Sequence, residues 1–76
     1  MKTLREFITE HELNPEDNGN GIDWYSPDEM IYQETRKIDE HTKLHIFSDG
    51  SLCGILDTDT TSILLSEDDL KDDYGF

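Results

Sequence analysis

Residues 42–57 read TKLHIFSDGSLCGILD and contain the clearest local signal in the chain. Two runs of β-prone side chains flank Asp49-Gly50, and glycine accepts a positive φ without steric cost, so the stretch predicts a β-hairpin. A two-residue loop would place Leu44 opposite Ile55. A three-residue loop with a bulge would shift that pairing by one residue.

The first residues predict a short amphipathic helix. Thr3 and Glu6 have the spacing of a capping box, in which each side chain bonds an unpaired backbone N–H at the helix start. One apolar helical face then follows at Leu4, Phe7, Ile8 and His11. Pro15 and the polar, glycine-containing run 14–21 indicate that the helix ends near Leu13 and that a polar loop follows.

The segment after this loop has two interpretations. Ser26-Pro27 followed by acids is typical of a helix start, and Tyr25 with Met30 has the spacing of a hydrophobic staple. Residues 30–38 fit a strand equally well. We therefore predict one helical turn followed by a strand.

The C-terminal third predicts a further strand over residues 60–65 and a final helical turn capped by Ser66 and Asp69. Residues 72–76 are expected to be a frayed tail, and both ends are expected to be soft. Residues 1–76 then form a single small acidic domain of α+β class. Its predicted architecture is an N-terminal amphipathic helix packed on a small, mostly antiparallel sheet of three to four strands, with a short C-terminal helical turn.

The charge of the chain is unevenly distributed. Its 76 residues carry a net charge of −13, and only 33% of them are hydrophobic. Residues 10–29 contain seven acids and no base, and residues 49–76 contain eight acids and one base. The stretch between them, residues 30–48, is neutral. Such a surface disfavours direct binding to nucleic acid, which requires cationic side chains that displace counterions.

Several other classes of protein are disfavoured. Cys53 is the single cysteine, so no internal disulfide is possible, and a reducing cytoplasm is the expected location. No apolar run suits a signal peptide or a membrane span. The chain has no phosphate-binding glycine loop, serine elbow or dinucleotide motif, and we expect neither catalysis nor a cofactor.

Two patterns resemble metal sites without satisfying their spacing. If Gly21 is placed at the invariant glycine of a calcium loop, the remaining ligand positions fall on Glu16, Asn18 and Asn20. Position twelve is then Pro27 in place of the required acid, so a plain polar loop is favoured. His41 and His45 would share a helical face, but on a strand they lie about 13 Å apart at about 3.3 Å per residue. We expect no metal, and we expect Cys53 to be a buried structural thiol.

The acidic blocks have a general and a specific interpretation. They are either a solubilising surface or an imitation of the phosphate backbone of nucleic acid. On the second interpretation the chain is an inhibitor of the DNA-mimic type, found in phages or mobile elements as an anti-restriction or anti-CRISPR protein. Its partner would be a nuclease, a polymerase or an RNA-guided complex. One candidate surface comprises Asp57, Asp59, Glu67, Asp68, Asp69, Asp72 and Asp73. The other comprises Glu10, Glu12, Glu16, Asp17, Asp23, Asp28 and Glu29.

Aromatic side chains beside the second surface, Trp24 and Tyr25, could anchor a partner if they are exposed. The favoured interpretation, however, places Trp24 in the core. An alternative function is a non-catalytic homodimeric accessory protein, in which an unpaired edge strand from the neutral middle pairs with a second copy and the acidity serves only solubility. The chain is expected to be a monomer or a homodimer.

Overall fold

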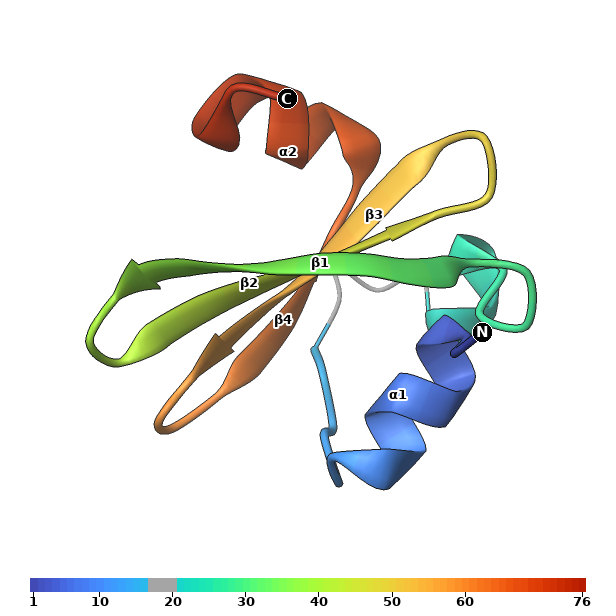
Figure 1. The fold of residues 1–76 in the computed structure, drawn as a ribbon, viewed down its shortest axis with the longest axis horizontal. Coiled ribbons are helices and arrows are strands. Elements are labelled where there is room, and N and C mark those ends of the chain that lie inside the picture. The colour runs from blue at the N-terminus through green and yellow to red at the C-terminus, as the bar shows by residue number, and fades with distance from the viewer. Residues whose placement is uncertain (17–20) are drawn as a thin grey trace.

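The hairpin predicted over residues 42–57 forms the centre of the sheet in the computed structural model, which describes residues 1–16 and 21–76 (Figure 1). Strand β2 (Thr42–Ser48) pairs antiparallel with β3 (Leu52–Thr58). The loop has three residues, so Leu44 pairs with Leu56, and the pairing with Ile55 expected from a two-residue loop is wrong. The Asp49 carboxylate widens the turn by accepting hydrogen bonds from the backbone N and the Oγ of Ser51, at 3.1 and 2.8 Å.

Two further strands and two helices complete an α+β fold, as predicted. Strands β1 (Ile31–Asp39) and β4 (Ser62–Leu65) flank the hairpin, giving an antiparallel sheet of order β1-β2-β3-β4. Helices α1 (Leu4–Glu10) and α2 (Glu67–Tyr74) lie on opposite sides of this sheet, and the 3₁₀ turn η1 (Ile22–Tyr25) precedes β1 (Figure 1). None of the described helices is long and apolar enough to cross a membrane.

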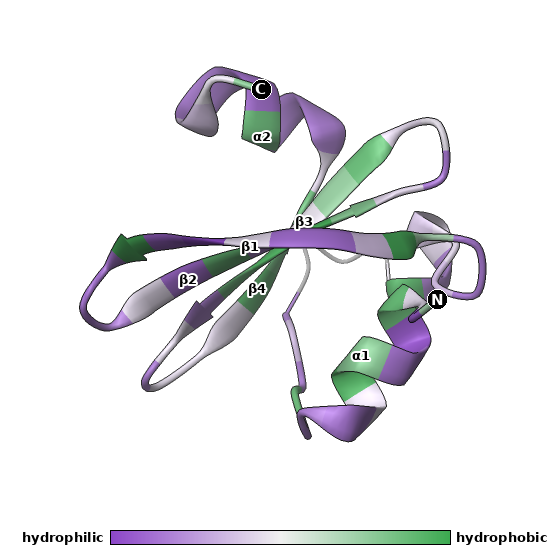
Figure 2. Cartoon of the chain, in the orientation of Figure 1, coloured by the Kyte–Doolittle hydropathy of each residue, from purple (hydrophilic) through white to green (hydrophobic). Residues whose placement is uncertain are grey.

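The sheet has a hydrophobic core on each face. Successive side chains of a strand point to opposite faces, so the buried run 44–47 of β2 contributes to both cores. The core on the α1 side contains Leu4, Phe7, Tyr25, Met30, Phe47, Cys53, Ile55 and Leu64. The core on the α2 side contains Leu44, Ile46 and Leu70. Figure 2 shows hydrophobic segments along β2 and β3, whereas the middle of β1 is hydrophilic.

The capping box of α1 is confirmed. Thr3 Oγ1 accepts a hydrogen bond from Glu6 N, and Glu6 Oε1 accepts one from Thr3 N, both at 3.1 Å. The helix ends at Glu10, earlier than predicted, because Glu12 takes a positive φ of 54°. Leu13 N then bonds Ile8 O at 3.0 Å, which closes the end of the helix.

The prediction of one turn followed by a strand is confirmed for the segment after η1. Met30 N donates to Ser26 O at 3.0 Å, closing a single helical turn, and β1 begins at the next residue. Ser26 does not cap this turn, because its φ of 50° and ψ of 58° place it in the left-handed region as the C-cap residue that follows η1. Tyr25 and Met30 are both buried in the core on the α1 side.

The C-terminal segment is more ordered than the sequence suggests. The cap formed by Ser66 and Asp69 is confirmed, but α2 continues to Tyr74, through residues expected to fray. Gly75 then ends the helix with a φ of 73°. Phe76 packs against the core on the α2 side, and its ring lies 4.1 Å from the Arg36 guanidinium. A hydrophobic residue just after a glycine cap commonly closes a helix in this way.

Close packing at Gly54 leads to the first prediction. A Cβ at this position would lie 3.2 Å from His45 O, 3.2 Å from Leu70 Cδ2 and 3.4 Å from Leu44 Cδ1. Because His45 O belongs to the central strand and cannot move freely, we expect Gly54→Ala to lower the free energy of unfolding by about 1–3 kcal/mol. Urea denaturation measures this loss, and Gly21→Ala is not a suitable control because its φ is positive. Thr60→Ala in the exposed loop between β3 and β4 is the control, and equal stabilities of the two variants would contradict the prediction.

Candidate protein-binding surface

The two acidic blocks, which are far apart in the sequence, meet at both ends of strand β3. One groove at the start of β3 is lined by residues of both blocks, and so is a second groove at its far end. Asp57 and Glu67 therefore lie on different surfaces, whereas the sequence had grouped them on one. From Leu52, beside Glu67, to Asp57 the strand extends about 17 Å at about 3.3 Å per residue.

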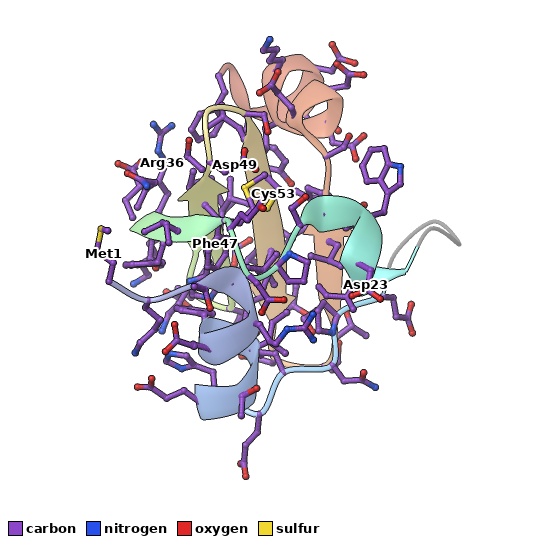
Figure 3. All side chains as sticks on the ribbon, turned by 90° about the vertical axis from the view of Figure 1, so that its right-hand side faces the viewer. Met1, Asp23, Arg36, Phe47, Asp49 and Cys53 are labelled. Atoms are coloured by element: carbon purple, nitrogen blue, oxygen red, sulfur yellow. The ribbon has the colours of Figure 1, made fainter. Side chains whose placement is uncertain are left out.

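The first groove, called here the Trp24 groove, lies between η1, the β2–β3 loop and the start of α2. Its volume is about 340 Å³. It is lined by Trp24, Tyr25, Ser26, Met30, Asp49, Ser51, Leu52, Cys53, Ser66, Glu67 and Asp68. Figure 3 shows Asp49 and Cys53 close to α2, on the hairpin side of this groove.

Trp24 is the largest exposed apolar group in this groove. Its side chain is 61% exposed, so the interpretation that placed it in the core is wrong. Tyr25 occupies the core position instead, at 5% exposure, and is not available as an anchor. The two rings meet edge to face, with centroids 5.0 Å apart and an interplanar angle of 77°. The Tyr25 ring therefore contacts the indole in one of the favoured arrangements of aromatic pairs.

Three carboxylates line the groove around this indole. The hydrogen bonds from Ser51 lower the pKa of Asp49, so this carboxylate stays ionised. Glu67 Oε2 accepts from Leu52 N at 2.8 Å, and its other oxygen lies 3.3 Å from Lys71 Nζ. Asp68 is exposed. Two of the three acids are thus held in place by bonds to the loop or to β3.

Cys53 lines the groove, but we expect its thiol to be unreactive in the folded protein. Burial raises the pKa of its thiol to about 12, and its side chain is almost completely enclosed. We expect iodoacetamide to leave the folded protein unmodified at pH 8 and to alkylate it fully in urea, because only the thiolate reacts. Intact-mass measurement after each treatment checks this, and rapid alkylation of the folded chain would contradict it.

The second groove, called here the β3–β4 groove, has a volume of about 360 Å³ at the far end of β3. It is lined by Glu12, Leu13, Asn14, Glu16, Asp57, Thr58, Asp59, Thr60, Thr61 and Ser62. The Glu16 backbone is fixed to β4, with Glu16 N donating to Ser62 O at 2.9 Å and Leu64 N donating to Glu16 O at 2.7 Å. Among the described residues, no exposed aromatic side chain lines this groove.

Two aspartates of the β3–β4 groove are paired with histidines. Asp59 Oδ2 lies 2.6 Å from His41 Nδ1. Asp57 Oδ2 lies 3.1 Å from His45 Nε2, and His45 Nδ1 lies 2.8 Å from Thr35 Oγ1. The sequence did not predict this partly buried polar chain across β1, β2 and β3, because it depends on the register of all three strands.

Basic side chains neutralise several acids of the N-terminal block. Arg5 Nε donates to Asp28 Oδ1 at 2.7 Å, and Arg5 Nη2 lies 3.3 Å from Asp23 Oδ1. The bond to Asp28 is the main reason that the pKa of Arg5 is raised. Lys2 forms an ion pair with Glu10 and lowers the pKa of that carboxyl. Asp23 and Asp28 are therefore poor candidates for contact with a partner.

Helix α2 carries three exposed acids without an ion-pair partner among the described residues. Asp68, Asp72 and Asp73 are exposed and form no ion pair among the described residues. Asp69 instead closes the helix cap through bonds to the Ser66 backbone and hydroxyl, both at 3.1 Å. Glu29 is exposed in the turn before β1. Three unpaired acids thus lie on α2, and one of them, Asp68, lines the Trp24 groove.

The structure describes part of the two patterns that resemble metal sites. Residues 1–16 and 21–76 contain no group of three His, Cys, Asp or Glu side chains suited to a metal ion. His41 and His45 engage different aspartates. Asp17, Asn18 and Asn20 lie outside the described residues.

Comparison with protein-family models, with curated proteins and with solved structures finds no match to this chain.

Proposed function

We propose that the protein is a non-catalytic, acidic protein-binding module of the cytoplasm. It occupies the basic nucleic-acid-binding surface of a nuclease, a polymerase or an RNA-guided complex, and acts as a DNA-mimic inhibitor of the phage or mobile-element type. The observation that carries this proposal is the exposed Trp24 beside fixed carboxylates and the free acids of α2. Interface hot spots are enriched in tryptophan, and charged side chains lie mainly at the rim around them.

The charge density of the chain supports the proposal. A net charge of −13 is distributed over a body whose longest extent is 29 Å. Duplex DNA of the same length carries about 17 charges at one per about 1.7 Å. A basic groove built for a duplex therefore meets a similar charge on this small domain, and long-range attraction would speed the encounter.

The proposed partner is tested by capture and competition. The protein is immobilised, incubated with host lysate in about 50 mM salt, and eluted with a salt gradient. We expect a basic nucleic-acid-binding protein to elute at moderate salt, and we expect duplex DNA to displace it, because both ligands would use the same surface.

A variant of α2 with fewer negative charges tests whether the free acids contribute to binding. Replacing Asp68, Asp72 and Asp73 by asparagine removes three charges from α2 but none of the ion pairs of the fold. The captured protein should elute at lower salt from this variant. Retention that is indifferent to salt, or a captured protein that DNA does not displace, would contradict the proposal.

A further inference from the structure

Strand β1 is an open edge of the sheet. It is nine residues long, and among the described strands it pairs with β2 alone, apart from an isolated bridge between Ile31 and Thr3. Seven of its residues, 33–39, are exposed. At the opposite edge, β4 is partly covered by the backbone of Glu16. An uncovered strand presents backbone donors and acceptors that another strand can bind.

The chain itself limits how much of this edge is available. Lys2 O accepts a hydrogen bond from Tyr32 N at 2.8 Å, so the N-terminal segment covers the beginning of β1. The pairing of β1 with β2 is irregular between Tyr32 and Glu34 and again between Lys37 and Asp39. Residues 34–37 remain as a regular stretch without a bulge. Bulges at both ends of an edge strand restrict pairing to the segment between them.

We propose that residues 34–37 of β1 pair antiparallel with the same residues of a second copy, with Thr35 on the two-fold axis. In an antiparallel ladder, two opposed residues either both direct their backbone N–H and C=O groups toward the partner strand or both direct them away. Because this direction alternates along a strand, opposed residues of two identical strands differ by an even number of positions. Within 34–37 only two symmetric registers then give three pairs: one is centred on Thr35 and the other on Arg36. A two-fold axis is the commonest symmetry of soluble dimers.

Charge complementarity selects the register centred on Thr35. In this register Glu34 of each copy lies opposite Arg36 of the other, giving two cross-strand pairs of opposite charge. In the register centred on Arg36, the two Arg36 side chains lie opposite each other, which is unfavourable. Within one copy Arg36 Nε already lies 2.5 Å from Glu34 Oε1, and its guanidinium stacks on Phe76. Both side chains are therefore held at the edge, where Figure 3 shows Arg36 at one margin of the molecule.

The proposed dimer is independent of the proposed function. No residue of 34–37 lines the Trp24 groove or the β3–β4 groove. In the view of Figure 3, Asp23 of the neighbouring η1 turn lies toward the margin opposite Arg36. Pairing through β1 therefore leaves both acidic grooves of each copy accessible.

Charge-reversal variants test this register directly. Sedimentation equilibrium of the wild type should give twice the monomer mass of 8.8 kDa. Glu34→Arg places arginine opposite Arg36, and Arg36→Glu places glutamate opposite Glu34, so we expect each variant alone to dimerise at least about tenfold more weakly. An equimolar mixture of the two variants should recover a dimer, because every opposed pair then has opposite charges. This recovery also shows that both variants are folded.

Lys37→Glu is the matched control, since it changes the net charge as Arg36→Glu does but lies opposite an uncharged residue in the proposed register. We expect it to remain dimeric. A monomeric wild type, or single variants that dimerise as well as the wild type, would overturn the proposal, and so would a mixture that stays monomeric.

Raising the salt from about 50 to about 500 mM should not dissociate the dimer, because screening reduces the repulsion between two acidic copies. The same salt should release the proposed basic partner, so the two proposals can fail separately.

Discussion

Trp24→Ala is expected to weaken binding of the captured basic partner by about 30-fold or more, which corresponds to about 2 kcal/mol. The thermal midpoint of the protein should change little, because the indole is 61% exposed and lies outside both cores. Calorimetric titration with the purified partner at low salt measures the affinity, and circular dichroism measures the midpoint.

A second exposed apolar residue serves as the control for this result. Ile63 on β4 is 37% exposed and lines neither groove. Ile63→Ala should leave the affinity unchanged within about twofold, since exposed residues outside an interface contribute little to binding. If both variants bind like the wild type, Trp24 is not the anchor of the interface. Equal losses would indicate general hydrophobic adhesion.

Phe47→Ala is expected to prevent stable folding. Phe47 is fully buried at the centre of the sheet, and its ring packs edge to face on Phe7 and Tyr32 at 5.2 and 5.8 Å. Truncation of a buried phenylalanine costs about 3–5 kcal/mol. A single core of this size supplies roughly 3–5 kcal/mol of net stability without a disulfide or metal, so the loss is comparable to the whole. Amide proton dispersion in the NMR spectrum, together with urea denaturation, measures the result.

Phe47→Leu distinguishes loss of volume from loss of the aromatic ring. Leucine keeps most of the apolar surface, so we expect this variant to fold with a lower urea midpoint. Trp24→Ala provides a second comparison, because it also replaces an aromatic residue by alanine but at an exposed position. A Phe47→Ala variant as stable as Trp24→Ala would contradict the assignment of the core.

The helix caps could be predicted from the sequence because their physics is local. Thr3 with Glu6, and Ser66 with Asp69, are three residues apart and satisfy backbone groups of their own turn. The hairpin was also predictable, but its register was not. The three-residue loop is accompanied by the hydrogen bonds that Ser51 donates to the Asp49 carboxylate, which two-residue turn statistics do not describe.

The candidate site was predicted only in part. The sequence identified the acids and Trp24, but it grouped Asp57 and Asp59 with the acids of α2, and it favoured a buried Trp24. Which of the neighbouring residues Trp24 and Tyr25 is exposed depends on how η1 packs against the core. Tyr25 takes the core position there, and its neighbour is directed into the groove.

The sequence by itself determined the α+β class, the capped helices, the central hairpin and the segregation of acids into two blocks. Each of these follows from residue spacing or composition over a few neighbouring positions. Only the tertiary structure decided which acids lie together, which are neutralised by Arg5 and Lys2, and which edge of the sheet remains open. These properties depend on the pairing of segments far apart in the chain, and a one-residue change of register would alter every such contact.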